Sequence, residues 1–95
     1  MRMSSVSLML PSQFRIDDVE AVYEWLDEQS ADANVCTIDA RQIERIDFCG
    51  LQLIVAFVAK LRRESIEISW NGVSEAFQQA VDDAQLHKYL GLHAS

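Results

Sequence analysis

The sequence predicts an α/β domain in which helices pack mainly on one face of a main sheet. Segments with strand periodicity alternate with segments of helical periodicity, in the order strand, helix, strand, helix, strand, helix. A chain of 95 residues suffices for one hydrophobic core. It holds only 3 glycines and 1 proline, so short turns join its elements. We therefore expect residues 1–95 to form a single domain without linker or internal repeat.

The first third of the chain predicts a strand, a short second strand and a helix. Apolar and polar residues alternate over residues 6–10, and Pro11 ends the pattern because proline has no N–H to donate to a sheet. Phe14 and Arg15 are candidates for the second strand. From Asp17 to about residue 30 the apolar residues recur at steps of three and four, which predicts an amphipathic helix with acidic residues in its first turn.

The middle third predicts a strand followed by the most apolar helix. Residues 35–39 are rich in β-branched side chains, and residues 51–63, which follow Gly50, are apolar over more than half of a helical circumference. Such a helix packs against a sheet on most of its surface. Its remaining strip is small near the start and basic near the end, and comprises Gln52, Ala56, Ala59, Lys60 and Arg63.

The last third predicts a strand, a helix and a short final turn. Apolar residues alternate over residues 66–70, Asn71 and Gly72 are a turn signal, and Ser74 stands at the N-cap of an amphipathic helix. Residues 86–92 are expected to pack as a short final turn. The strand, helix and strand of the middle region are expected to cross over right-handed.

The charge of the chain excludes some classes of partner. The sequence has 8 basic and 15 acidic side chains, a net charge of −7, which is the wrong sign for binding nucleic acid or an anionic membrane surface. Most of this charge lies on the helix expected at residues 17–28, which has no lysine or arginine. Its outer face is either a solvated surface or a docking surface for a basic partner.

Membrane insertion and export are not expected. No apolar run approaches the roughly 20 residues that a membrane-spanning helix needs. The first ten residues lead into Pro11 without the small-residue cleavage pattern of a signal peptide. We expect a cytoplasmic protein.

Fingerprints of catalysis, cofactor binding and metal binding are missing from the sequence. There is no glycine-rich phosphate loop, no GxSxG and no HExxH, and the two cysteines, Cys36 and Cys49, lack metal-binding spacing and are expected to be free thiols. His87 and His93 lie near the C-terminus. Neither a cofactor nor a metal is expected, and pairing of Cys49 with a histidine is the remaining route to an enzyme.

The segment IDFCGLQLI, residues 46–54, is the candidate site. It places an aspartate, two intervening residues and a glycine at the start of the most apolar helix, where free backbone N–H groups and the helix dipole attract an anion. The simpler reading is structural: Asp47 caps the helix, Gly50 permits a close approach, and Cys49 is a small apolar group.

The chain resembles the STAS domain family around this segment. Residues 37–53, TIDARQIERIDFCGLQL, are similar to the family's central signature, in which a strand ending in Asp leads through a loop to a DS(S/T)G or DTxG motif and an apolar helix. Residues 66–80, IEISWNGVSEAFQQA, resemble the next strand, turn and helix, and residues 84–92 resemble the closing segment. The first third of the chain resembles the family more weakly.

The resemblance implies a fold and a role. It implies a mixed sheet of four or five strands with helices on one face, and a non-catalytic domain that binds a protein: a regulatory kinase, a signalling protein or a transporter ATPase subunit. Anti-sigma factor antagonists and small subunits of ABC-type lipid transport systems share this fold. In the family the partner docks over the motif and the start of the second helix, which here corresponds to Asp47, Phe48, Cys49, Gly50, Leu51 and Gln52.

The sequence departs from the family pattern at the residue that phosphorylation modifies. Phe48 stands where switch members carry Ser or Thr, and Cys49 also lacks a hydroxyl, so no phosphorylation is expected at either position. Phe48 is then either an aromatic anchor in an interface or a filler of core volume. Cys49, in the first turn of a helix, could supply redox control instead.

Three hypotheses follow. The first is a stand-alone regulatory or signalling domain that holds its partner without motif phosphorylation. The second is a non-catalytic subunit of an ABC-type lipid transporter, which uses the same helix. The third, from another class, is a small redox-active enzyme built on Cys49. The sequence does not identify the partner or the oligomeric state.

Overall fold

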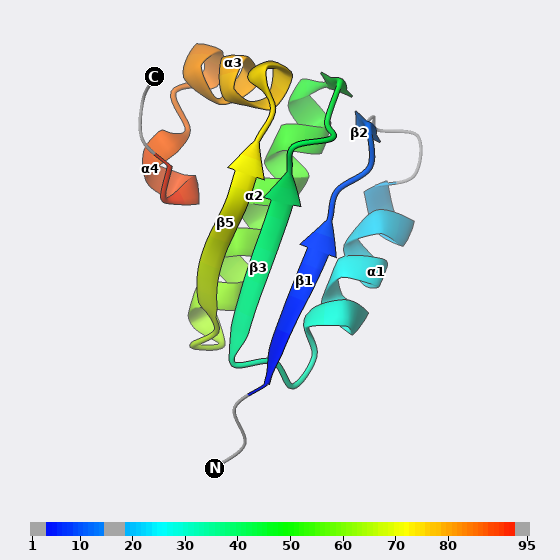
Figure 1. Ribbon diagram of the computed structural model, residues 1–95, viewed down its shortest axis with the longest axis vertical. Helices are drawn as coiled ribbons and strands as arrows, with labels where there is room; N and C mark the ends of the chain where they lie inside the picture. The colour runs from blue at the N-terminus through cyan, green and yellow to red at the C-terminus, as the bar shows by residue number, and fades with distance from the viewer. Residues whose placement is uncertain (1–3, 15–18, 93–95) are drawn as a thin grey trace.

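The structure is a computed structural model that describes residues 4–14 and 19–92 (Figure 1). Arg15, Asp17 and His93 lie outside this range. The elements, in chain order, are β1 (Ser5–Met9), β2 (Gln13–Phe14), α1 (Val19–Ser30), β3 (Val35–Ala40), β4 (Arg45–Ile46), α2 (Phe48–Arg63), β5 (Glu67–Val73), α3 (Glu75–Ala84) and α4 (His87–Leu90). This alternation confirms the α/β class.

The main sheet differs from the expected mixed sheet of four or five strands. Among the described residues it has three strands in the order β1-β3-β5, and both pairings are parallel. A helix lies between each pair of consecutive long strands, α1 before β3 and α2 before β5, and such a crossover returns the chain in the same direction. The parallel arrangement therefore follows from the element order.

The two remaining strands form a separate small sheet instead of extending the first. Leu10 N–H still donates to the Asp39 carbonyl at 2.9 Å, but Pro11 then removes a donor and the chain leaves the ladder. The Ser12 carbonyl accepts hydrogen bonds from the N–H groups of Glu44 and Arg45 instead, and β2 pairs with β4 in parallel over two residues. Pro11 is therefore where the expectation of a single larger sheet fails.

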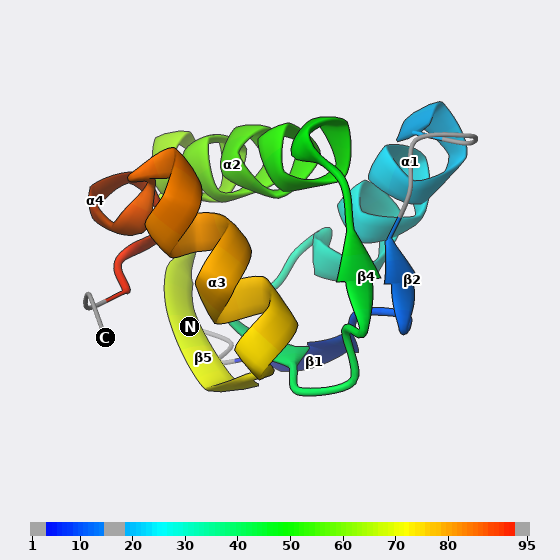
Figure 2. The same ribbon diagram turned by 90° about the horizontal axis from the view of Figure 1, so that it is seen from above.

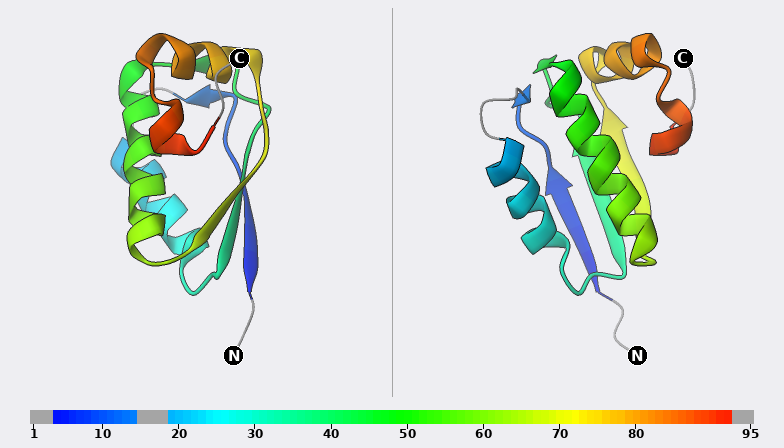
Figure 3. Two further views of the ribbon diagram at one scale, coloured as in Figure 1. Left: turned by 90° about the vertical axis from the view of Figure 1, so that its left-hand side faces the viewer. Right: turned by 180° about the vertical axis from the view of Figure 1, so that it is seen from behind.

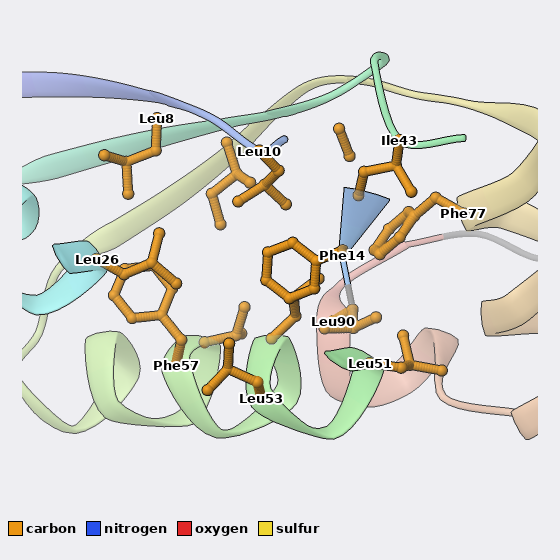
Figure 4. Packing of buried hydrophobic residues seen from close by; sticks show 14 of the residues in the cluster. Leu8, Leu10, Phe14, Leu26, Ile43, Leu51, Leu53, Phe57, Phe77 and Leu90 are labelled. Carbon is orange, nitrogen blue, oxygen red and sulfur yellow. The ribbon is translucent and has the colours of Figure 1, made fainter. Parts of the chain in front are cut away.

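The core lies between the main sheet and one layer of helices. Seen edge-on, α1 and α2 lie on the same side of the sheet (Figure 3), and α3 crosses above the carboxyl ends of the strands (Figures 1 and 2). Inward-facing residues of the strands, such as Leu8 and Ile38, are buried together with Phe57 of α2 and Phe77 of α3 (Figure 4). The other face of the sheet carries Ser7, Thr37 and Ser69, and also Met9, which is 52% exposed.

The expected turn at Asn71 and Gly72 is part of β5. The register with β3 shifts here: Ile38 pairs with Trp70 and Asp39 with Gly72, so Asn71 is an extra residue in a β-bulge. Gly72 has φ 158°, and a Cβ there would lie 2.7 Å from Cγ of Arg41. Sequence reasoning identified the irregularity at this point but not that the strand continues through it.

Next to the bulge, a buried carboxylate is paired with an arginine. Asp39 is only 7% exposed, and its Oδ1 accepts from the backbone N–H and the Nε–H of Arg41, both at 3.0 Å. Its Oδ2 accepts from Nη2 of Arg41 at 2.8 Å. These side-chain and backbone hydrogen bonds from Arg41 lower the pKa of Asp39 from 3.8 to about 2. The stem of Arg41 thus lies beside Gly72 of β5 while its guanidinium is paired with Asp39; we call this arrangement the clamp.

This clamp predicts a pH-dependent contribution to stability. A carboxyl with a depressed pKa stabilises the fold at pH values above its unfolded pKa, and this contribution is lost as pH falls through the folded pKa. Asp39→Asn should therefore have a lower free energy of unfolding than the parent protein at pH 7. This difference in free energy should become smaller as the pH falls from 3.8 to about 2. Urea unfolding followed by circular dichroism measures the free energy of unfolding at each pH, with Asp32→Asn as the matched exposed control. A gap that does not change with pH would contradict the clamp.

Candidate functional site

The candidate site forms where β4 leads into α2. Asp47 has extended backbone geometry (φ −95°, ψ 173°), and its Oδ1 accepts from the N–H of Gly50 at 2.7 Å. Asp47 is therefore the N-cap of α2, as expected, and it satisfies one of the donors that a helix start leaves unpaired. The helix begins at Phe48, three residues earlier than expected. Gly50 consequently lies inside the first turn.

Gly50 allows the helix to approach β2 closely. A Cβ at this position would lie 2.6 Å from the carbonyl oxygen and 2.8 Å from Cδ1 of Phe14. The main chain of Asp47 faces the same residue, because its N–H donates to the Phe14 carbonyl at 3.4 Å. The first turn of α2 is thus fixed against β2 by contacts that leave no room for a side chain.

The six residues predicted to bind a partner differ in their exposure to solvent. Phe48 is 60% exposed, and Gln52, one turn later, is also exposed. Asp47 and Cys49 are half-buried, whereas Gly50 and Leu51 are buried. Phe48 therefore does not fill core volume, and the side chains of this group that are most available to another molecule are Phe48 and Gln52.

Two shallow apolar grooves meet at Phe48. We call the first the Ala80 groove; it lies between the start of α2 and α3 and is lined by Ile46, Asp47, Phe48, Leu51, Ala80, Asp83 and Ala84. The second, the Ala56 groove, runs along the outer strip of α2 and is lined by Phe48, Gln52, Val55, Ala56, Ala59 and Leu86. Figure 3 shows that α3 and the start of α2 lie at the same end of the main sheet.

Sequence reasoning missed the contribution of the last third of the chain to this site. Ala80, Asp83 and Ala84 belong to α3, and Leu86 follows it. Ala80 and Ala84 looked like core residues by their periodicity, and nothing in the local sequence brings them next to Phe48. The small residues of the strip on α2, in contrast, were visible in the sequence.

Two of the basic residues near the end of α2 are paired within the molecule. Lys60 forms ion pairs with Asp27 of α1 and, at 3.9 Å, with Glu64, and its Nζ lies 5.9 Å from the centre of the Tyr23 ring. Arg62 donates from Nη1 to the carbonyl of Tyr89 at 2.9 Å. Part of the acidic charge of α1 therefore serves to hold α2.

The two cysteines have different environments. Cys36 is completely buried in β3, and this burial raises its pKa to about 11. Cys49 is half-buried in the first turn of α2. Within the described part of the chain, no hydrogen bond joins Cys49 to a histidine; Nε2 of His87 is paired with Asp82. The geometry that a cysteine nucleophile with a histidine base needs is therefore not assembled among these residues.

The fold and the site define a class of protein. A buried apolar helix presents an exposed aromatic residue and two apolar grooves at one end, which is typical of a domain that binds another macromolecule. Over residues 4–14 and 19–92, no group of three or more His, Cys, Asp or Glu residues is placed to hold a metal ion. In that same range no helix has the length and apolar character to cross a membrane.

The chain belongs to the STAS domain family. The family model described as "Mlab, STAS domain" matches residues 2–92, nearly the whole chain. Domains of this family are generally non-catalytic binding domains. Comparison with curated proteins and with solved structures found no match.

The close contact at Gly50 predicts that a single methyl group destabilises the protein. Gly50→Ala should lower the free energy of unfolding by about 1–3 kcal/mol, because overpacking forces the helix away from Phe14. At an unhindered helical position the same change would instead stabilise by about 1 kcal/mol. Urea unfolding measures the difference, with Gln52→Ala on the exposed face as the control. An unchanged or raised stability would show that the contact does not constrain α2.

The two thiols predict a selective alkylation pattern. In the native protein at pH 7, iodoacetamide should modify Cys49 no faster than glutathione, because no base is paired with it in the described residues. Cys36 should react only in urea, because it is buried. Mass spectrometry of quenched time points measures both rates, and Cys49→Ser assigns the sites. Faster reaction of Cys49 than of glutathione would support the redox hypothesis instead.

Proposed function

We propose that this chain is a non-catalytic, protein-binding STAS domain of a bacterial regulatory or signalling system. In this proposal the partner docks on the start of α2, and phosphorylation of the motif plays no part. The observation that carries the proposal is Phe48, a large aromatic side chain that is 60% exposed where two apolar grooves meet. Exposed aromatic residues with adjoining pockets are the usual anchors of protein interfaces.

The local structure supports Phe48 as an anchor. The Asp47 cap and the close packing of Gly50 on Phe14 fix the first turn of α2, so Phe48 projects from a rigid backbone. A side chain held in this way loses less conformational freedom on binding than one on a mobile loop. Leu51, which is buried one turn further on, anchors the same turn to the core.

The chemistry of the motif supports binding without a phosphate switch. Residues 46–54 contain no Ser, Thr or Tyr, so a kinase has no hydroxyl to modify at the start of α2. A phosphate of about −2 charge would alter an interface by repulsion and desolvation. Here an apolar ring occupies the position of the hydroxyl, which favours a partner that stays bound without a phosphorylation switch.

A second candidate is a subunit of an ABC-type lipid transport system. The Ala56 groove favours it, because apolar residues extend beyond the motif along α2 to Ala59 and across to Leu86. A longer apolar surface suits a permanent complex better than a transient one. On this reading the partner is the transporter's ATPase subunit, and binding should change its rate of ATP hydrolysis.

Removal of the aromatic ring should abolish partner binding while the fold is retained. Tagged parent protein and Phe48→Ala are produced in the source cell, and co-purified proteins are quantified by mass spectrometry. The amount of co-purified partner should fall at least tenfold with Phe48→Ala. This is the loss expected when an interface residue that contributes about 2 kcal/mol to binding is removed. Gln52→Ala should weaken capture as well.

The matched control is Met9→Ala, because Met9 is 52% exposed on β1, in a different part of the surface. Circular dichroism confirms the fold of each variant. Full retention of the partner by both Phe48→Ala and Gln52→Ala would overturn the proposal. A captured ATPase whose rate changes with stoichiometric binding would favour the transport subunit over the signalling domain.

A further inference from the structure

Strand β1 lies at one edge of the main sheet. Leu10, just after the strand, donates its N–H to the Asp39 carbonyl of β3 at 2.9 Å. Backbone groups of successive residues point to opposite edges of a strand, so the N–H and C=O groups of Ser5, Ser7 and Met9 point away from β3. Among residues 4–14 and 19–92, no strand pairs with this outer edge of β1.

The sequence of β1 does not protect its outer edge. Edge strands of soluble proteins are commonly interrupted by a bulge or proline, or carry a charged side chain. β1 contains no charged residue, its register with β3 is continuous, and Pro11 comes only after the strand. The opposite edge of the sheet differs, because β5 has a bulge at Asn71 and Nε1 of Trp70 donates to the carbonyl of Leu90 of α4 at 2.8 Å.

Helix α1 carries apolar side chains beside this edge. It packs on β1 and lies beyond it, on the side away from β3 (Figures 1 and 3). Asp27 of α1 faces α2, because it is paired with Lys60, and Leu26 is buried in the core. Each residue of a helix is rotated by about 100° from the previous one, so Trp25 lies on the flank away from α2. Trp25 is 41% exposed, and Val22, one turn earlier on this flank, is half-buried.

The outer edge of β1 and this flank of α1 form one surface, which we call the β1 corner. Its residues are Ser5, Val6, Ser7, Met9, Val22, Trp25 and Gln29. The surface is hollowed at the start of β1, where Ser5, Val6 and Gln29 line a shallow depression. Val6 is half-buried and alternates with the outward backbone groups of its neighbours. Main-chain donors and acceptors therefore lie directly beside apolar side chains.

The geometry of the β1 corner selects its occupant. An extended peptide pairs with an edge strand through its main chain and places alternate side chains on one face of the sheet. A second copy of the chain fits less well. Two β1 strands paired antiparallel would lie about 4.8 Å apart with both α1 helices on the same face, whereas packed helices need about 8–10 Å. The net charge of −7 disfavours an acidic segment.

We propose that an extended, non-acidic segment of a partner protein adds a strand to the main sheet at the β1 corner. Its main chain pairs with the N–H and C=O groups of Ser5, Ser7 and Met9. Its apolar side chains, at alternate positions, pack against Val6 and Trp25. This surface belongs to β1 and α1, whereas the docking site proposed above belongs to α2 and α3, so the two proposals do not depend on each other.

A designed peptide tests the pairing before any partner is known. The probe acetyl-KVTVTVK-amide has apolar residues at alternate positions, and acetyl-KTTTTTK-amide is its control of equal length and charge. Each is titrated into ¹⁵N-labelled protein and followed by NMR. The probe should shift the amide signals of Ser5, Ser7 and Met9 and the indole N–H signal of Trp25, and should slow hydrogen exchange at Ser7 and Met9. The control should bind at least about fourfold more weakly, the factor for one buried methylene-sized group.

Two matched pairs of variants locate the contact. Ser7→Pro keeps the pairing with β3, because the Ser7 N–H points outward, but its ring blocks an added strand; it should weaken the probe at least about tenfold. Ser7→Ala keeps the N–H and should bind like the parent protein. Trp25→Ala should weaken the probe about two- to tenfold. Tyr89→Ala removes an aromatic side chain that is 56% exposed on α4 and should have little effect.

The outcomes are distinct from those of the partner-capture experiment with Phe48→Ala. Equal affinity of Ser7→Pro and Ser7→Ala, or unchanged hydrogen exchange at Ser7 and Met9, would overturn the inference. If circular dichroism shows that Ser7→Pro does not fold, the exchange measurement and the comparison of Trp25→Ala with Tyr89→Ala decide it. A dimer in analytical ultracentrifugation that Ser7→Pro abolishes would assign the edge to a second copy and overturn the proposed occupant.

Discussion

The contact between the first turn of α2 and the carbonyl group of Phe14 is the constraint on which the site depends. A glycine at position 50 lets the helix lie against β2 at a distance that no other residue allows. Because the helix start is fixed there, its next residues follow by helical geometry: Leu51 points into the core and Phe48 points away from it. The exposed aromatic ring is therefore a consequence of how α2 is seated.

Most of the fold could be predicted from the sequence, and the failure is local. Periodicity identified the three long strands and three longer helices because their inward faces are continuous apolar stripes, as at Leu8 and Ile38. The number of strands in the main sheet, which the resemblance to the family implied, was wrong. The short strand expected at Phe14 is present as β2, but it pairs with β4 in a separate sheet. Whether β2 joins the sheet depends on where Pro11 redirects the chain and on the Ser12 carbonyl, which are tertiary features.

Only one part of the candidate site could be predicted from the sequence, namely the part that residues 46–54 form by themselves. The Asp47 cap and the need for Gly50 are local, because spacing along a helix start determines both. Phe48 lines one groove with Asp83 and another with Leu86. Their proximity could not be predicted from the local sequence, because it depends on how α3 crosses the end of the sheet. The sequence likewise showed that α2 ends in basic residues, but not that Lys60 is paired with Asp27.

The face of the main sheet opposite α1 and α2 differs chemically from the proposed docking surface. Parallel sheets are usually covered on both sides, so an open face needs a surface that water can solvate. Here the paired positions Ser7, Thr37 and Ser69 place a row of hydroxyl groups across β1, β3 and β5, on the face that alternates with the buried residues Leu8 and Ile38. A second apolar layer would desolvate that row. The surface around Phe48 is lined mainly by apolar residues, although Asp47, Gln52 and Asp83 also line it, and we propose it as the surface that a partner covers.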